Sequence, residues 1–242
     1  MLKSAIKTLI IMLALVHSPL ARAHEELSPQ NKADIKKMIS EYLQNNPKEL
    51  AQALDNMQDY YRAESERQKK LAVKNLGPQI TNDPRDKYIG KRDAKHVIVE
   101  FFDYNCTYCR KNLTAVQKLI EERDDILFIF KELPILSETS GEAARAALAI
   151  ESPQNYFEFH KRLMQAKERL TSNDIFNALQ RAGENPAAIL TFSKSTEITS
   201  HIADNQKLAQ ELGISGTPSF YINGKIYEGY LDKDEISALL KN

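Results

Sequence analysis

Short apolar runs alternate with helically spaced apolar positions along most of the chain. Residues 96–102 (HVIVEFF) and 126–131 (ILFIFK) are rich in β-branched and aromatic side chains, which is typical of buried strands. Residues 111–123 lie between them and place apolar side chains three to four positions apart, which predicts a helix. Two later apolar runs joined by Asn223-Gly224 predict a hairpin with a type I′ turn. This pattern indicates an α/β fold.

The long segment between the second strand and the hairpin, residues 138–212, is helical by pattern. Its apolar side chains recur at helical spacing in several groups, and residues 183–186 (GENP) interrupt them. His160 lies on one of these apolar faces, so we interpret it as a packed core side chain and not as a ligand. His96 and His201 are interpreted in the same way.

The N-terminal part of the chain has an apolar stripe of its own. Residues 28–29 (SP) begin a predicted helix, and residues 46–47 (NP) restart it, with the asparagine as N-cap. Residues 62–70 contain no large apolar side chain and predict a solvated helix or linker, and residues 77–78 (GP) are expected to end this arm. The stripe consists of Ile35, Met38, Ile39, Tyr42, Leu43, Leu50, Leu54, Met57 and Tyr61.

An arm of about fifty residues cannot bury a core alone. Its stripe must therefore pack on the rest of the chain or on another copy of the arm. Because the charged run at residues 62–70 holds the stripe away from the rest of the chain, we expect self-association. Docking within one chain, as an ordinary amphipathic helix would do, is the alternative.

The first 23 residues have the order of a secretory signal peptide. Two lysines precede an apolar run at residues 8–16, and residues 21–23 (ARA) are small enough for cleavage. The run is far shorter than the roughly 20 residues that span a membrane, which argues against a membrane anchor. The predicted mature chain, residues 24–242, has a net charge of about −3. It shows neither the basic surplus of a nucleic-acid-binding protein nor an acidic tail.

The chain contains only two cysteines, Cys106 and Cys109. Disulfides of exported proteins usually connect distant segments, but this pair would close a loop of four residues and restrain the unfolded chain by only roughly 2 kcal/mol. A structural zinc site needs a second pair of ligands, and covalent haem needs histidine at position 110, which is arginine. Redox exchange is the use that remains.

Cys106 lies at the predicted junction between the strand at 96–102 and the helix at 111–123. Free backbone N–H groups and the positive end of the helix dipole stabilise a thiolate there and lower its pKa. Cys109 falls one turn into the helix on the same side, where it can attack a mixed disulfide held on Cys106. Pro218, at the start of the hairpin, lacks an N–H and suits a strand edge left open for an incoming peptide.

These features together resemble the DsbA-like branch of the thioredoxin superfamily. The resemblance rests on VEFFDYNCTYC at residues 99–109, on GTP at residues 216–218 and on the leader. It is greatest to the exported ScsC and Com1-type proteins, which carry an N-terminal helical extension. It implies an α/β thioredoxin fold with a helical insertion, preceded by an α-helical arm. The implied regions are a signal peptide (1–23), a helical oligomerisation arm and linker (24–76) and a catalytic domain (77–242) with its insertion at about 138–212.

The resemblance also implies roles for individual residues. Cys106 matches the nucleophilic cysteine and Cys109 the resolving one. The proline of the GTP sequence matches a cis-proline that faces the disulfide, and the backbone of the threonine before it matches the edge that pairs with a substrate strand. The implied substrate-binding residues are Thr107, Tyr108, Thr217 and Pro218.

Two charged residues complete the set of predicted site residues. Glu100 matches a buried acid beneath the active site, and Lys131 matches the lysine that often partners it. The alternative for both is an ion pair at strand ends on the surface, because charged residues are seldom buried. We expect burial, since Glu100 sits within an otherwise apolar run, and a buried acid could relay protons as the thiols change state.

The sequence therefore predicts an exported thiol-disulfide oxidoreductase of the periplasm or cell envelope, with disulfide isomerase activity favoured. The alternatives are a DsbA-like dithiol oxidase, or a copper-stress or envelope protein without catalytic turnover. The expected partners are unfolded or misoxidised exported proteins, a membrane redox partner that resets the cysteines, and further copies of the chain in a homodimer or homotrimer. Neither a cofactor nor a metal nor nucleic acid is expected.

Overall fold

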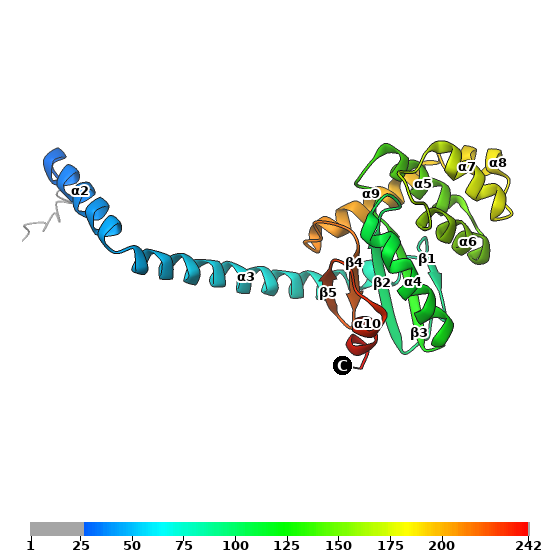
Figure 1. Cartoon of the computed structure of the whole chain (residues 1–242), viewed down its shortest axis with the longest axis horizontal. Coiled ribbons are helices and arrows are strands. Elements are labelled where there is room, and N and C mark those ends of the chain that lie inside the picture. Colours follow the sequence, from blue (N-terminus) through cyan, green and yellow to red (C-terminus); the bar gives the residue numbers. More distant parts are fainter. Residues whose placement is uncertain (1–26, 242) are drawn as a thin grey trace, which may run out of the picture. The chain divides into compact units, whose positions relative to one another are not determined.

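The computed structural model describes residues 27–241 of the 242-residue chain (Figure 1). The predicted signal peptide at residues 1–23 lies outside the described residues. Contacts divide the chain into two units, residues 1–60 and residues 61–242, and one long helix, α3 (Pro47–Thr81), belongs to both. No helix in the described part of the chain is long and apolar enough to cross a membrane.

The N-terminal unit contains α2 (Pro29–Asn45) and the first part of α3. Ser28 caps α2, because its hydroxyl accepts the N–H of Asn31 at 3.1 Å. Asn46 holds the predicted N-cap position before α3, because its backbone carbonyl accepts the N–H of Leu50 at 3.2 Å, but the Asn46 side chain does not cap that helix. Its side-chain amide donates to the carbonyl of Tyr42 at 2.7 Å, so it closes the end of α2 instead. The stripe side chains exposed in this unit are Ile35, Met38, Ile39, Tyr42, Leu43, Leu50, Leu54 and Met57.

The predicted end of the arm at Gly77-Pro78 is wrong, because α3 continues through both residues to Thr81. Val73 and Ile80 flank this pair and are buried among side chains of the sheet and of α9 (Thr196–Glu211). Each buried apolar side chain gains about 2 kcal/mol. Two of them offset the roughly 3 kcal/mol that a proline costs inside a helix.

A five-stranded sheet in the order β1-β3-β2-β4-β5 forms the centre of the second unit. β2 and β3 run parallel, connected by α4 (Thr107–Glu122), and the other pairs are antiparallel. The predicted hairpin is confirmed, since Asn223 and Gly224 both have the positive φ that a type I′ turn requires. The strands are β1 (Lys87–Ile89), β2 (His96–Phe102), β3 (Ile126–Glu132), β4 (Ser219–Ile222) and β5 (Lys225–Glu228).

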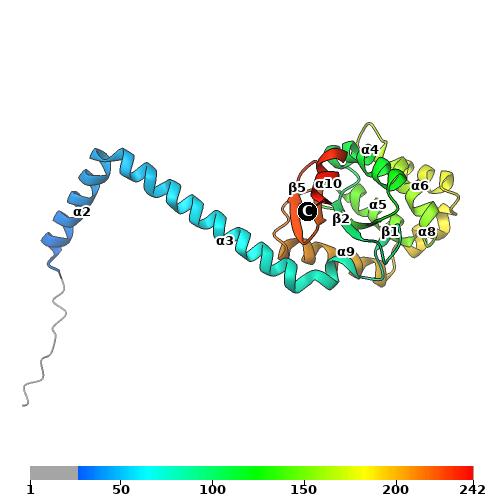
Figure 2. The same ribbon diagram turned by 90° about the horizontal axis from the view of Figure 1, so that it is seen from below.

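Helices cover both faces of this sheet. Figure 2 shows α4 and α10 on one side of the strands and α9 on the other. The segment predicted as helical, residues 138–212, consists of helices joined by short loops and inserted between β3 and β4. These helices are α5 (Glu138–Ala149), α6 (Pro153–Met164), α7 (Ser172–Arg181), α8 (Pro186–Phe192) and α9, and α10 (Lys233–Leu239) follows the hairpin.

Successive side chains of each strand enter different cores. Phe102 and Phe130 point to the core under α4, whereas Phe101 and Ile129 point to the core under α9 and the end of α3. This alternation decides which functional groups share a face of the sheet.

Candidate active site

Cys106 is the N-cap residue of α4, as the sequence predicts. Its extended backbone ends the turn after β2, and its sulfur accepts the N–H of Cys109 at 3.5 Å. Both cysteines are free thiols, Cys106 at 6% exposure and Cys109 at 1%. Cys106 is therefore the sulfur that a partner can reach, and Cys109 lies behind it.

The loop before β4 brings Thr217 and Pro218 to the cysteine pair. The peptide bond between them is cis, as the resemblance implies. The Cys106 thiol donates to the carbonyl of Thr217 at 3.0 Å, across 111 positions of sequence. The predicted substrate edge and the predicted nucleophile are thus in direct contact.

The two thiols differ strongly in proton affinity. A hydrogen bond with the Cys109 side chain is the largest cause that lowers the pKa of Cys106 to about 5. The side chain of Thr217 and the backbone N–H groups of Tyr108 and Cys109 also lower this pKa, against the opposing effect of burial. Burial raises the pKa of Cys109 far above its ordinary value, and the neighbouring Cys106 and Glu100 act in the same direction. At neutral pH the site therefore holds one thiolate and one thiol.

We expect the thiolate absorbance of reduced protein to appear with a midpoint near pH 5. Because the folded pKa lies below the ordinary value of 9.0, ionisation stabilises the reduced fold fully above pH 9. That contribution is lost as the pH falls through about 5. Ultraviolet titration of the wild type, with Cys106→Ser as the blank, measures the midpoint. A midpoint at or above 9 would contradict an activated thiol.

Thr107 and Tyr108, between the cysteines, are both exposed. Tyr108 lies under the Lys111 ammonium group, which is 5.1 Å from the centre of its ring. Two further exposed apolar side chains, Ile135 and Leu136, follow β3. Their N–H groups donate to one carboxylate oxygen of Asp103, at 2.8 and 3.0 Å, and this fixes their loop beside the turn that leads to Cys106.

Glu100 is buried, with 2% of its surface exposed, so the alternative of a surface ion pair is wrong. It lies on the strand that leads to the redox pair. Burial is the main cause that raises its pKa to about 8, and the charge of Cys106 adds to it. A carboxyl group with this proton affinity can both give and take a proton near neutral pH.

Lys131 is also buried, but the prediction that it partners Glu100 is wrong. In the parallel register Glu100 pairs with Phe130, and Lys131 pairs with Phe101, so the two charged groups lie on opposite faces of the sheet. The ammonium group of Lys131 instead binds Asp86 at 2.7 Å and the carbonyl of Gln79, in the last turn of α3, at 2.8 Å. Lys131 thus fastens α3 to the sheet behind the active site.

His201 belongs to the cluster behind the sheet, because its ring nitrogen lies 3.0 Å from the carboxylate of Asp86. His160 lies among aromatic rings on the other face, as predicted for a core residue, and burial lowers its pKa to about 3. In the described part of the chain, no group of three or more histidine, cysteine, aspartate or glutamate side chains could hold a metal ion.

Sequence reasoning missed a second buried acid, Glu132, at the end of β3. The hydroxyl groups of Tyr104 and Tyr156 donate to the same oxygen of its carboxyl group, at 3.1 and 3.4 Å. Burial raises its pKa well above the ordinary value. No sequence signal indicated this placement, because the sheet face that Glu132 shares with Glu100 depends on the register of β2 and β3.

The turn before Cys106 is held by polar side chains that were also missed. The amide of Asn105 donates to the hydroxyl groups of Ser137, Thr139 and Ser140, at 2.9 to 3.2 Å, which ties the turn to the start of α5. Its oxygen accepts the N–H of Leu170 at 2.8 Å, from the loop after α6. An asparagine directly before the cysteine was the available signal.

Comparisons with known proteins agree with this geometry. A family model described as Thioredoxin matches residues 81–242. ScsC from Proteus mirabilis, in a transitional conformation, is 30% identical, with a TM-score of 0.64, over 89% of this chain and 97% of that one. The thiol-disulfide exchange protein alpha-DsbA2 from Wolbachia pipientis is 25% identical, with a TM-score of 0.67, over 73% of this chain and 96% of that one.

Curated relatives of two kinds match this chain. Disulfide bond formation protein D of Bacillus subtilis is 24% identical over 68% of this chain and 78% of its own length. A Na(+)/H(+) antiporter, NhaA 3 of Salinispora tropica, is 27% identical over 64% of this chain. The chain spans only about a quarter of the antiporter's length, 24%.

Proposed function

This chain belongs to the thioredoxin family, and from that membership we propose that it is an exported protein disulfide isomerase acting through Cys106 and Cys109. Thiol-disulfide exchange follows from the family and the cysteine pair, and isomerisation is the more specific proposal. The activated thiol of Cys106, which touches the carbonyl of Thr217 at a helix start, supports the exchange. The observation that carries isomerisation is the exposed apolar stripe of the N-terminal arm, which another copy of the chain could cover.

The proposed reaction begins when the Cys106 thiolate attacks one sulfur of a client disulfide. A bond forms between Cys106 and that sulfur, the client S–S bond breaks, and the second client sulfur leaves as a thiolate that takes up a proton. In isomerisation another client thiolate then attacks the mixed disulfide and frees Cys106. In escape from a stalled mixed disulfide, Cys109 gives its proton to Glu100 and attacks the Cys106 sulfur. The Cys106–Cys109 bond forms, the bond between Cys106 and the client breaks, and the client sulfur leaves as a thiolate that takes up a proton.

The proposed client site lies around Thr217 and Pro218. A proline donates no N–H, so the backbone at this edge is open to an extended peptide. Tyr108 lies between the cysteines, and Ile135 and Leu136 lie in the loop bound to Asp103, so their exposed side chains offer apolar surface near the site that suits an unfolded client. Expected clients are unfolded or misoxidised proteins of the periplasm or cell envelope, and a membrane redox partner would reset the cysteines.

We further propose that the arm predicted at residues 24–76 oligomerises through residues 24–60, and that the catalytic domain predicted at 77–242 also takes in the rest of α3, after removal of the signal peptide at 1–23. Apolar positions 50, 54 and 57 alternate spacings of four and three, which is the repeat of a coiled-coil seam. Their side chains, and the stripe on α2, are exposed in the single chain. A dimer or trimer would cover them and hold several redox pairs around one client.

A dithiol oxidase is the second candidate, and the low pKa of Cys106 favours it. Stabilising the thiolate stabilises the reduced protein relative to its disulfide, which makes the disulfide more oxidising. A lowered pKa of Cys106 changes the equilibrium between the dithiol and disulfide forms of the cysteine pair. The arm, by contrast, changes how many active sites are held near one client. The two candidates therefore differ in a measurable way.

Ribonuclease refolding separates the two candidates. We expect the full mature chain to reactivate scrambled ribonuclease, whose disulfides are mispaired, faster than it oxidises reduced ribonuclease. The reverse order would favour the oxidase. Thiol-disulfide exchange itself would be contradicted if the protein showed neither activity and if glutathione neither reduced nor oxidised its cysteine pair.

A further inference from the structure

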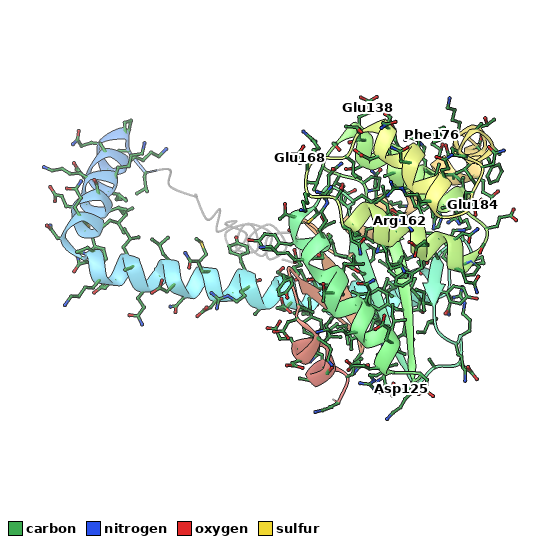
Figure 3. All side chains as sticks on the ribbon, turned by 45° about the vertical axis from the view of Figure 1, so that its right-hand side comes forward. Asp125, Glu138, Arg162, Glu168, Phe176 and Glu184 are labelled. Atoms are coloured by element: carbon green, nitrogen blue, oxygen red, sulfur yellow. The ribbon has the colours of Figure 1, made fainter. Side chains whose placement is uncertain are left out.

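Arg110 follows the second cysteine directly and is held by three carbonyl oxygens. Its Nε donates to the backbone carbonyl of Tyr104 at 2.8 Å, and its two terminal nitrogens donate to the side-chain carbonyl of Asn105 at 3.2 Å and to the backbone carbonyl of Glu168 at 2.8 Å. Figure 3 shows Glu168 in the loop after α6, beside the end of α4 that carries the cysteines. The guanidinium group thus joins the redox turn to the helical insertion.

These three partners are neutral. In the described part of the chain no carboxylate oxygen lies within ion-pair distance, 4.0 Å, of Arg110, although other arginines pair with acids. A guanidinium group keeps its charge under all ordinary conditions. Hydrogen bonds to carbonyl groups hold that charge in place without neutralising it, so its field reaches the neighbouring groups.

The cysteine pair is one of those neighbours. Burial lowers the pKa of Arg110, and the negative charges of Asp103, Cys106 and Cys109 act in the opposite direction. Coulomb interactions are mutual, so the positive charge of Arg110 acts on the cysteines in turn. Asp103 adds negative charge near the site, whereas Glu100, with a pKa raised to about 8, adds negative charge only at higher pH. The Lys111 ammonium group lies over the ring of exposed Tyr108.

We propose that Arg110 is a positioning residue that stabilises the Cys106 thiolate by a fixed, unneutralised charge and links the reactivity of the cysteine pair to the loop after α6. The proposal rests on the proposed thiol-disulfide exchange and adds a residue that sets its equilibrium. A positive charge near Cys106 favours the thiolate and therefore the reduced protein. A client that moves the loop at Glu168 would also move this charge.

Two substitutions that both keep a hydrogen-bond donor isolate the charge. In full-length mature protein, Arg110→Gln removes the charge and Arg110→Lys retains it. We expect Arg110→Gln to raise the titration midpoint of Cys106 by about one unit and to shift the equilibrium with glutathione about tenfold toward the protein disulfide. Arg110→Lys should restore most of both quantities, to within about threefold of wild type.

Arg169→Gln is the matched control. Arg169 lies in the same loop and also donates to a backbone carbonyl, that of Leu136, at 3.1 Å. Its loss removes the same charge from the chain, and we expect wild-type values for both the Cys106 midpoint and the glutathione equilibrium. Circular dichroism of each variant reports whether the fold is retained. If Arg110→Gln and Arg110→Lys are both destabilised, the two are compared with each other and not with the wild type.

Equal midpoints for Arg110→Gln and Arg110→Lys would overturn the proposal, because only the charge separates them. A shift in Arg169→Gln as large as in Arg110→Gln would also overturn it, since any nearby charge would then suffice. If wild-type protein fails to exchange with glutathione, the proposed function fails as well. If wild type exchanges and Arg110→Gln behaves like it, only the role of Arg110 is lost.

Discussion

Replacing Cys106 with serine is expected to abolish thiol-disulfide exchange, lowering the rate by about three orders of magnitude or more, as loss of a nucleophile does in other covalent catalysts. Cys106 is the reachable thiol and carries the lowered pKa. Cys109→Ser should retain the first attack but lose the escape step. It should therefore accumulate mixed disulfides with client proteins.

Non-reducing electrophoresis after rapid acid quenching measures these species. Cys109→Ser should give client adducts that disappear with dithiothreitol, and Cys106→Ser should give few. The double variant is the control for disulfides formed elsewhere. If Cys106→Ser gave more adducts than Cys109→Ser, Cys109 would be the nucleophile and Cys106 the resolving cysteine.

Removing the arm is expected to cause the second largest effect, a loss of isomerase activity by about tenfold or more, because linked sites act at high effective concentration. The structure corrects where the cut should fall. Val73 and Ile80 are buried in the catalytic unit, so a deletion through residue 76, the predicted end of the arm, would damage it. A chain that begins at residue 61 keeps the whole unit of residues 61–242.

The shortened chain should be a folded monomer by light scattering and should retain dithiol oxidation within about twofold, since the redox pair is untouched. Two double variants of the full chain test the same point. Leu54→Glu with Met57→Glu places charge on the exposed stripe, whereas Gln52→Glu with Asn56→Glu places equal charge on the opposite side of α3. Only the first pair should dissociate the oligomer.

A full-length chain that is already monomeric would contradict this arrangement and would favour the oxidase. Loss of oxidase and isomerase activity in equal measure would also contradict it. In that case the arm would support the catalytic unit itself and would not multiply its active sites.

Much of the active site could be predicted from local sequence. A strand followed by a helix places Cys106 at the helix start, and the short spacing places Cys109 one turn behind it. Glu100 could be assigned to the interior because the residues on both sides of it are apolar. These properties depend on the periods of the helix and the strand, which neighbouring residues impose.

The partners of the buried charges could not be predicted in this way. Lys131 and Glu100 have similar local surroundings, yet the register of β2 and β3 sends them to opposite faces. Asp86, the acid that binds Lys131, comes from a loop 45 positions earlier in the chain. Strand register is set by the packing of the whole sheet, so the pairing emerges only in the folded unit.

By itself, then, the sequence determined the two-cysteine chemistry, the strand-helix junction that activates it, the hairpin and the helical insertion. Tertiary structure alone decided that Thr217 touches Cys106, that α3 passes through Pro78, and that Arg110 is held without an acidic partner. Periodicity reports which side of an element is buried. It does not show which residues the buried side contacts, because packing brings those residues together from distant positions in the chain.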